Sequence, residues 1–176
     1  PLAYSRLINV PMVTTIHGFS SKKILPVYQK YNKNTYYVSI SNANREKSLD
    51  YIRTIYHGIN VKNYKLKSGK GSYLLFFGRI HPDKGTYEAI QIALKLNMEL
   101  IIAGIIQDKE YYNKFVKPYI SDKIHYIGSV GPDKKSDILG NAVALLHPIH
   151  FEEPFGYSVI ESMACGTPVV AFNKGS

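Results

Sequence analysis

The segment Tyr73-Leu-Leu-Phe-Phe-Gly-Arg-Ile-His-Pro-Asp-Lys-Gly-Thr86 decides the fold class of this chain. Its first five residues predict a buried strand, Gly78 predicts a turn, and a helical pattern follows over 86–96. A strand, a glycine turn with two cations and a helix make an anion site at the carboxyl edge of a sheet. Arg79 offers a planar fork for phosphate oxygens, and Lys84 offers a mobile point charge. Singly, each residue is also common on solvated surface, so only the combination predicts a site.

Outward from this segment, apolar runs alternate with helix-length segments. We expect strands over 12–16, 36–40, 52–56, 73–77, 100–103, 124–127, 144–147 and 169–172. We expect helices over 44–50, 86–96, 109–119, 133–140 and 157–164. This rhythm predicts an α/β fold with two doubly wound parallel sheets of Rossmann-like type. The polar, glycine-bearing stretch 65–72 marks the boundary between the two units.

A second turn of the same kind lies in Glu153-Pro-Phe-Gly-Tyr-Ser-Val-Ile-Glu161. Free amides at a helix start attract phosphate, so Gly156, Tyr157 and Ser158 can present backbone donors. Glu161 follows about one turn into the helix, near enough to accept from the hydroxyls of a sugar or a ribose. Two acidic acceptors for hydroxyls and two basic donors for a diphosphate suit a nucleoside-diphosphate sugar.

Glu161 is the only charged residue between Phe155 and Phe172. A lone carboxylate in apolar surroundings needs a partner. The simpler alternative is a partly exposed glutamate on an amphipathic helix.

Three motifs in this order resemble the donor half of family 4 glycosyltransferases, which are retaining enzymes of the GT-B fold. The motifs are Gly78-Arg79 with Lys84-Gly85, Glu153-x7-Glu161, and Met163-Ala-Cys-Gly-Thr-Pro-Val-Val170. Segments before residue 66 resemble the amino-terminal domain of the same family: Val10-Pro-Met-Val-Thr-Thr-Ile-His17-Gly18, Val38-Ser-Ile-Ser41 and Ile55-Tyr-His-Gly58-Ile-Asn60. The sequence around these segments is most similar to that of bacterial pterin glucosyltransferase-like proteins.

The resemblance implies that residues 1–66 are the latter part of an acceptor-side domain and residues 67–176 the first part of a nucleotide-sugar donor domain. Both units are then incomplete, because a complete pair would need about twice this length. It also implies transfer of a hexose, as from UDP-glucose, to an unknown acceptor with retention of configuration. The acceptor classes are a small molecule, a glycan or a lipid-linked sugar.

The resemblance also assigns roles to single residues. Arg79 and Lys84 stabilise the leaving diphosphate, Glu153 meets the transferred sugar, and Glu161 meets the ribose. His17 follows the first expected strand and faces the donor sugar, although a turn histidine without a role is the alternative. The expected donor-binding residues are Gly78, Arg79, Lys84, Glu153, Phe155, Gly156, Tyr157, Ser158 and Glu161.

We expect neither a metal nor a cofactor. The chain has no Asp-x-Asp pair, and no two of its histidines show a metal-ligand spacing on one helix face. Arg79 and Lys84 can carry the counter-charge for the diphosphate instead.

Composition excludes few function classes. With 176 residues, 45% apolar, and 20% charged, the chain reads as globular. The net charge of +9 invites a nucleic-acid reading, since lysine and tyrosine interleave over 28–37, but no nucleic-acid motif accompanies them. Attraction to an anionic membrane surface or an acidic acceptor stays open.

Without a membrane span or signal peptide we expect a cytoplasmic protein, with the inner face of the membrane as the alternative location. Cys165 reads as a buried structural thiol.

Two other classes of function remain open. One is a sugar-nucleotide binding module without turnover, which would bind a donor but not hydrolyse it. The other is a phosphorylase or an epimerase on the same scaffold, because fold does not determine function. An assay with phosphate against an acceptor separates a phosphorylase from a transferase.

Overall fold

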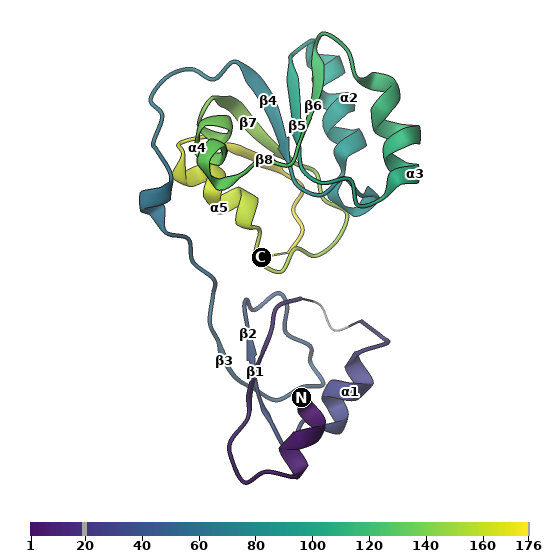
Figure 1. The fold of residues 1–176 in the computed structure, drawn as a ribbon, viewed down its shortest axis with the longest axis vertical. Coiled ribbons are helices and arrows are strands. Elements are labelled where there is room, and N and C mark those ends of the chain that lie inside the picture. Colours follow the sequence, from purple (N-terminus) through teal and green to yellow (C-terminus); the bar gives the residue numbers. More distant parts are fainter. Residues whose placement is uncertain (19–20, 176) are drawn as a thin grey trace. The chain divides into compact units, whose positions relative to one another are not determined.

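The computed structural model describes residues 1–18 and 21–175 and divides the chain into two compact units (Figure 1). The first unit comprises residues 1–58 with 152–155 and 175, and the second comprises 59–151 and 156–174. The units divide after Gly58, earlier than the predicted boundary at residue 66. The reason is that the intervening segment already bonds within the second unit: Lys65 N donates to Ser136 Oγ (2.7 Å), and Lys67 N donates to Cys165 O (3.1 Å).

The first unit holds a three-stranded parallel sheet in the order β1-β2-β3. Its elements are η1 (Leu2–Arg6), β1 (Val13–Ile16), α1 (Leu25–Lys30), β2 (Tyr36–Ser39) and β3 (Tyr51–Thr54). A small core of Ile16, Tyr37 and Leu49 lies against this sheet. The three strands confirm the expected ones to within two residues at each end, whereas α1 has no counterpart among the expected helices.

The helix expected over 44–50 is wrong, because this segment forms turns. The buried Asn44 side chain bonds to backbone groups that a helix would not offer. Its Oδ1 accepts from Ile40 N (3.2 Å), and its Nδ2 donates to Ile16 O (3.3 Å). Asparagine side chains compete with the helix for backbone hydrogen bonds in this way. Here these bonds favour turns over a helix in the segment 44–50.

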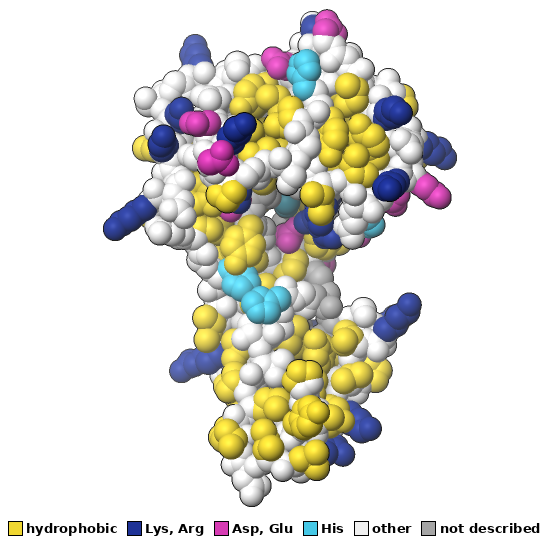
Figure 2. Space-filling view, viewed as in Figure 1, with side chains coloured by type: hydrophobic (Ala, Val, Ile, Leu, Met, Phe, Trp, Pro, Cys, Tyr) yellow, Lys and Arg dark blue, Asp and Glu magenta, His cyan; other side chains and the backbone are white. Residues whose placement is uncertain are grey.

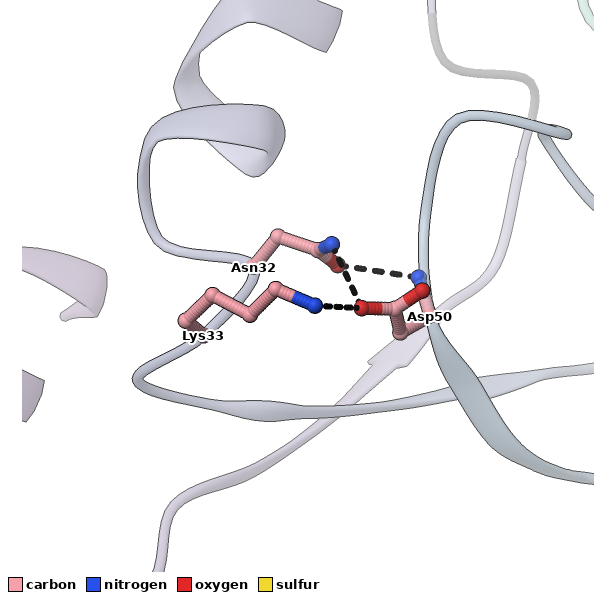
Figure 3. A network of polar contacts seen from close by, with 3 residues as sticks. All are labelled: Asn32, Lys33 and Asp50. Atoms are coloured by element: carbon pink, nitrogen blue, oxygen red, sulfur yellow. Dashed lines mark hydrogen bonds and ion pairs between the residues drawn. The ribbon is translucent and has the colours of Figure 1, made fainter.

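A polar network joins the loop before β2 to the start of β3 (Figure 3). Lys33 Nζ lies 2.7 Å from Asp50 Oδ2, and Asp50 N donates to Asn32 Oδ1 at 2.9 Å. The hydrogen bond and the charge of Lys33 lower the pKa of Asp50. Because both side chains of the ion pair are exposed, the pair adds little to stability.

The second unit holds a five-stranded, fully parallel sheet in the order β6-β5-β4-β7-β8 (Figure 1). The strands are β4 (Tyr73–Phe77), β5 (Leu100–Ala103), β6 (Ile124–Gly128), β7 (Ala142–His147) and β8 (Val169–Ala171), and all five confirm expected strands. Alternate residues of β4 point to opposite faces. Leu74 and Phe76 join one core cluster, and Leu75 joins the other. A sheet buried on both faces is what a doubly wound fold requires.

Helices cover both faces of this sheet, with α2 and α3 on one side and α4 and α5 on the other (Figure 1). The helical elements are η2 (Val61–Asn63), η3 (Pro82–Lys84), α2 (Thr86–Leu96), α3 (Lys109–Tyr111), the π-helical η4 (Tyr112–Val116), η5 (Lys117–Tyr119), α4 (Pro132–Gly140) and α5 (Tyr157–Ala164). The expected helices over 86–96, 133–140 and 157–164 are confirmed. The segment 109–119 is helical but broken into three parts, since Pro118 lacks the N–H and crowds the preceding turn.

Lysine and arginine side chains are scattered over the drawn face of each unit rather than gathered in one patch (Figure 2). Within residues 1–18 and 21–175, no helix is both long and apolar enough to cross a membrane. Cys165 is fully buried, as expected, and burial raises the pKa of its thiol.

Candidate functional site

The order of the strands in the second unit creates a switch point between β4 and β7. From β4 the chain moves outward to β5 and β6, and then returns to β7 on the other side of β4. The loops after these two neighbouring strands therefore diverge at the carboxyl edge of the sheet, where open α/β sheets bind ligands. They are the segments that carry Arg79 with Lys84, and Gly156 with Glu161.

The loop after β4 brings both predicted cations to this edge. Gly78 N still pairs with Ala103 O (2.9 Å), so the turn begins directly at the end of the strand. The exposed Arg79 guanidinium donates from Nη1 to Gln107 Oε1. Lys84 ends η3, and its Nζ lies 4.5 Å from the centroid of the Phe151 ring. The two cations are thus presented by one short loop, as the sequence predicted.

Although the loops after β4 and β7 lead to opposite faces of the sheet, they contact each other where they leave it. Gly85 has φ +73°, and a Cβ at this position would lie 2.0 Å from Pro148 O. His150 N donates to Asp83 O (2.8 Å), and His150 Nε2 lies 2.8 Å from Glu88 Oε1. These contacts hold the loop after β4 against the start of the loop after β7.

We expect Gly85→Ala to lower the free energy of unfolding by about 2–5 kcal/mol. About 1–2 kcal/mol comes from the left-handed backbone and about 1–3 kcal/mol from the forced overlap with Pro148. Gly128→Ala is the matched control, because Gly128 has φ +74° but nothing within 4 Å of the added Cβ. Urea unfolding measures both variants. Equal losses would contradict the close approach at Gly85.

The helix α5 begins at the same edge of the sheet. Its N-cap is Gly156, whose φ of 81° suits glycine, and no side chain in the described part of the chain caps it. The first-turn amides of Tyr157 and Ser158 therefore lie at the positive end of the helix dipole. Glu161 sits one turn further along the helix.

Glu161 is only 7% exposed, and its buried carboxylate has hydrogen-bond and charge partners. Its Oε1 accepts a hydrogen bond from Tyr64 Oη (2.6 Å) and lies 2.9 Å from Lys135 Nζ. Sequence analysis did not select either partner. The only signal was the isolation of the carboxylate among apolar residues, which predicts a partner but does not choose among 22 lysines and arginines.

Three predicted site residues belong to the first unit: His17, Glu153 and Phe155. His17 directly follows β1 and is exposed, and its Nδ1 lies 3.2 Å from His57 Nε2 with the two rings stacked. The His57 ring in turn meets the edge of the Phe155 ring at a centroid distance of 5.3 Å. His57 lies in the segment 55–60 that resembles the family, but the sequence assigned it no role and did not place it beside His17.

The remaining predicted residues belong to the second unit: Gly78, Arg79, Lys84, Gly156, Tyr157, Ser158 and Glu161. Among residues 1–18 and 21–175, no group of three histidine, cysteine or acidic side chains has the geometry of a metal site. Within this unit the arrangement can bind an anion through two cations and helix amides, and can accept hydroxyl hydrogen bonds through Glu161.

One solved structure and one curated protein illustrate the similarity of this chain to known proteins. The structure of Anabaena Alr3699/HepE in complex with UDP and glucose matches with a TM-score of 0.82 and 20% identity, covering 99% of this chain and 56% of that one. Glycogen synthase of Mycobacterium tuberculosis is 24% identical over 204 residues, covering 99% of this chain and 49% of that protein. The fold is of the GT-B glycosyltransferase type, as the sequence predicted.

The sequence model of the glycosyl transferases group 1 matches residues 60–176, and the chain belongs to this family. The uncharacterized glycosyltransferase MJ1607 of Methanocaldococcus jannaschii is 27% identical over 146 residues, which are 72% of this chain and 37% of that protein. The chain thus spans half or less of the length of these curated relatives.

Proposed function

We propose that the protein transfers a hexose from a nucleoside-diphosphate sugar to an acceptor, with retention of configuration and without a metal ion. The observation that carries the proposal is the switch point of the second unit, where Arg79, Lys84 and the start of α5 occupy the two diverging loops. Membership in family 4 and the likeness to pterin glucosyltransferase-like proteins belong to the same proposal.

The chemistry of these groups supports a diphosphate as the leaving group. Negative charge develops on the diphosphate as the bond to the sugar breaks, and fixed positive groups stabilise it without taking or giving a proton. Two cations and the helix amides supply that charge here, so the chain does not need a divalent ion for it. Glu161 then accepts from the ribose, and Glu153 and His17 are assigned to the transferred sugar.

The comparisons support the donor class only by similarity. HepE of Anabaena was crystallised with UDP and glucose, and glycogen synthase is named for the polymer that it makes. We therefore propose UDP-glucose as the first donor to test. A cytoplasmic location, or one at the inner face of the membrane, is part of the proposal.

We expect UDP, GDP or ADP, and UDP-glucose or another nucleotide sugar, to stabilise the protein against heat in the presence of EDTA. The reason is that Arg79 and Lys84 neutralise the diphosphate. A thermal-shift series with EDTA, and with Mn²⁺ in its place, measures this.

Three outcomes would decide against parts of the proposal. Stabilisation only with Mn²⁺ would contradict metal independence, and no stabilisation by any nucleotide would contradict the donor site. Donor binding without hydrolysis or transfer would favour a binding module over an enzyme.

A further inference from the structure

In the described part of the chain, the two side-chain contacts given above for Glu161 are made by the same carboxylate oxygen. Among the residues that the structure describes, Tyr64 Oη and Lys135 Nζ both approach Oε1, at 2.6 and 2.9 Å. A carboxylate has two oxygens with about four acceptor positions, so Oε2 keeps its own acceptor capacity. The two contacts therefore orient the carboxylate and leave Oε2 able to accept further hydrogen bonds.

We propose that Tyr64 and Lys135 are positioning residues, which hold Glu161 Oε1 so that Oε2 accepts from the hydroxyls of the donor ribose. The inference rests on the proposed function, since it needs Glu161 to meet a ribose. It adds two residues from outside the sequence motifs to the recognition of the nucleoside.

Both donors are themselves held by backbone contacts. Tyr64 N donates to Val61 O (3.1 Å), and Lys135 N donates to Gly131 O (3.1 Å) in the first turn of α4. The residues that follow them are also joined, because Lys65 N donates to Ser136 Oγ (2.7 Å). The backbones that carry the two donors are thus held by hydrogen bonds and are joined to each other one residue further along the chain.

The charges around Glu161 fit this role. Lys135 is partly buried, with 26% of its side chain exposed, and its Nζ also lies 5.9 Å from the centroid of the Phe77 ring. Burial, together with the hydrogen bond to Glu161, raises the pKa of Tyr64, so its hydroxyl remains a donor at neutral pH. A short bond from a neutral hydroxyl and an ion pair restrict the carboxylate more than either would alone.

A purely structural role is the alternative. Lys135 and Tyr64 would then only neutralise a buried carboxylate, and their removal would lower stability without affecting how ligands are distinguished. Recognition of the ribose hydroxyls separates the two roles, because a ligand without these hydroxyls cannot use Glu161 at all.

The test compares UDP with 2′,3′-dideoxy-UDP by calorimetry, and GDP and ADP with their dideoxy counterparts if UDP does not bind. The variants are Lys135→Met, which keeps the aliphatic stem, and Tyr64→Phe, which removes one hydroxyl. Glu161→Gln serves as the reference, and Lys134→Met is the matched control on the exposed neighbour. Lys135→Arg restores the charge.

We expect the wild type to prefer UDP over the dideoxy ligand by at least tenfold. Lys135→Met and Tyr64→Phe each lower this preference several-fold toward that of Glu161→Gln, while dideoxy-UDP binds them as it binds the wild type. Lys134→Met leaves the preference unchanged, and Lys135→Arg recovers most of it. If Lys135→Met does not fold, the single-hydroxyl change in Tyr64→Phe decides.

Failure of the inference and failure of the proposed function give different results. If Glu161→Gln loses the preference but Tyr64→Phe and Lys135→Met keep it in full, the two residues are structural and the inference is wrong. If the wild type has no preference, or binds none of the nucleotides, the proposed role of Glu161 is itself contradicted and the inference is overturned with it.

Discussion

Glu153→Ala is expected to lower turnover of the sugar donor by about tenfold to a thousandfold, while binding of UDP stays close to that of the wild type. Glu153 precedes Pro154, whose ring favours an extended backbone at the preceding residue and so restricts the direction of the carboxylate. The expected loss arises because the reacting sugar is misplaced, whereas the nucleoside diphosphate keeps the contacts that we propose for it at Arg79, Lys84 and α5.

Two measurements on the same variant decide this prediction. Calorimetry with UDP and with the intact donor reports binding, and steady-state turnover reports the reaction. Glu152→Gln is the control, because Glu152 is the exposed neighbour whose Oε2 accepts from Gly175 N at 2.7 Å. Equal losses of affinity for both ligands would overturn the division of roles between Glu153 and Glu161. Full activity of Glu153→Ala would mean that the motif has been misread.

Arg79→Ala is expected to lower the rate of transfer about a hundredfold, equivalent to roughly 3 kcal/mol of transition-state stabilisation. The guanidinium is exposed and donates to Gln107 in the ligand-free structure, so it can turn to a diphosphate without unfolding its surroundings. Its removal leaves the diphosphate with one side-chain cation. Thermal stability without ligand should hardly change, because surface substitutions of this kind are usually nearly neutral.

The matched control removes a cation from the same unit at a distance from the switch point. Lys95 lies in the last turn of α2, far along the helix from the loop that carries Arg79, and Lys95→Ala should leave both nucleotide stabilisation and rate intact. Unchanged nucleotide binding in Arg79→Ala would count against the whole site assignment. A loss as large in Lys95→Ala would indicate a general effect of net charge.

The strands were predictable from local pattern, and most of the helices were too. All eight expected strands are present, because short apolar runs bounded by turns have few other stable arrangements in a folded α/β chain. The helix expected over 44–50 failed, since its composition is helical but the Asn44 side chain bonds backbone groups of two other segments. The bond to Ile40 N is local, whereas the bond to Ile16 O joins residues 28 positions apart, which local propensity does not register.

The candidate site divides in the same way. Sequence pattern was enough to select the loops after β4 and β7 and the glutamate pair, because glycine turns, cations and helix starts are local features. It did not show that these two loops diverge at the switch point of a sheet, that Pro148 approaches Gly85, or that Tyr64 and Lys135 meet Glu161. Those relations depend on strand order and on packing between distant segments, and only the folded chain brings the partners within hydrogen-bonding distance.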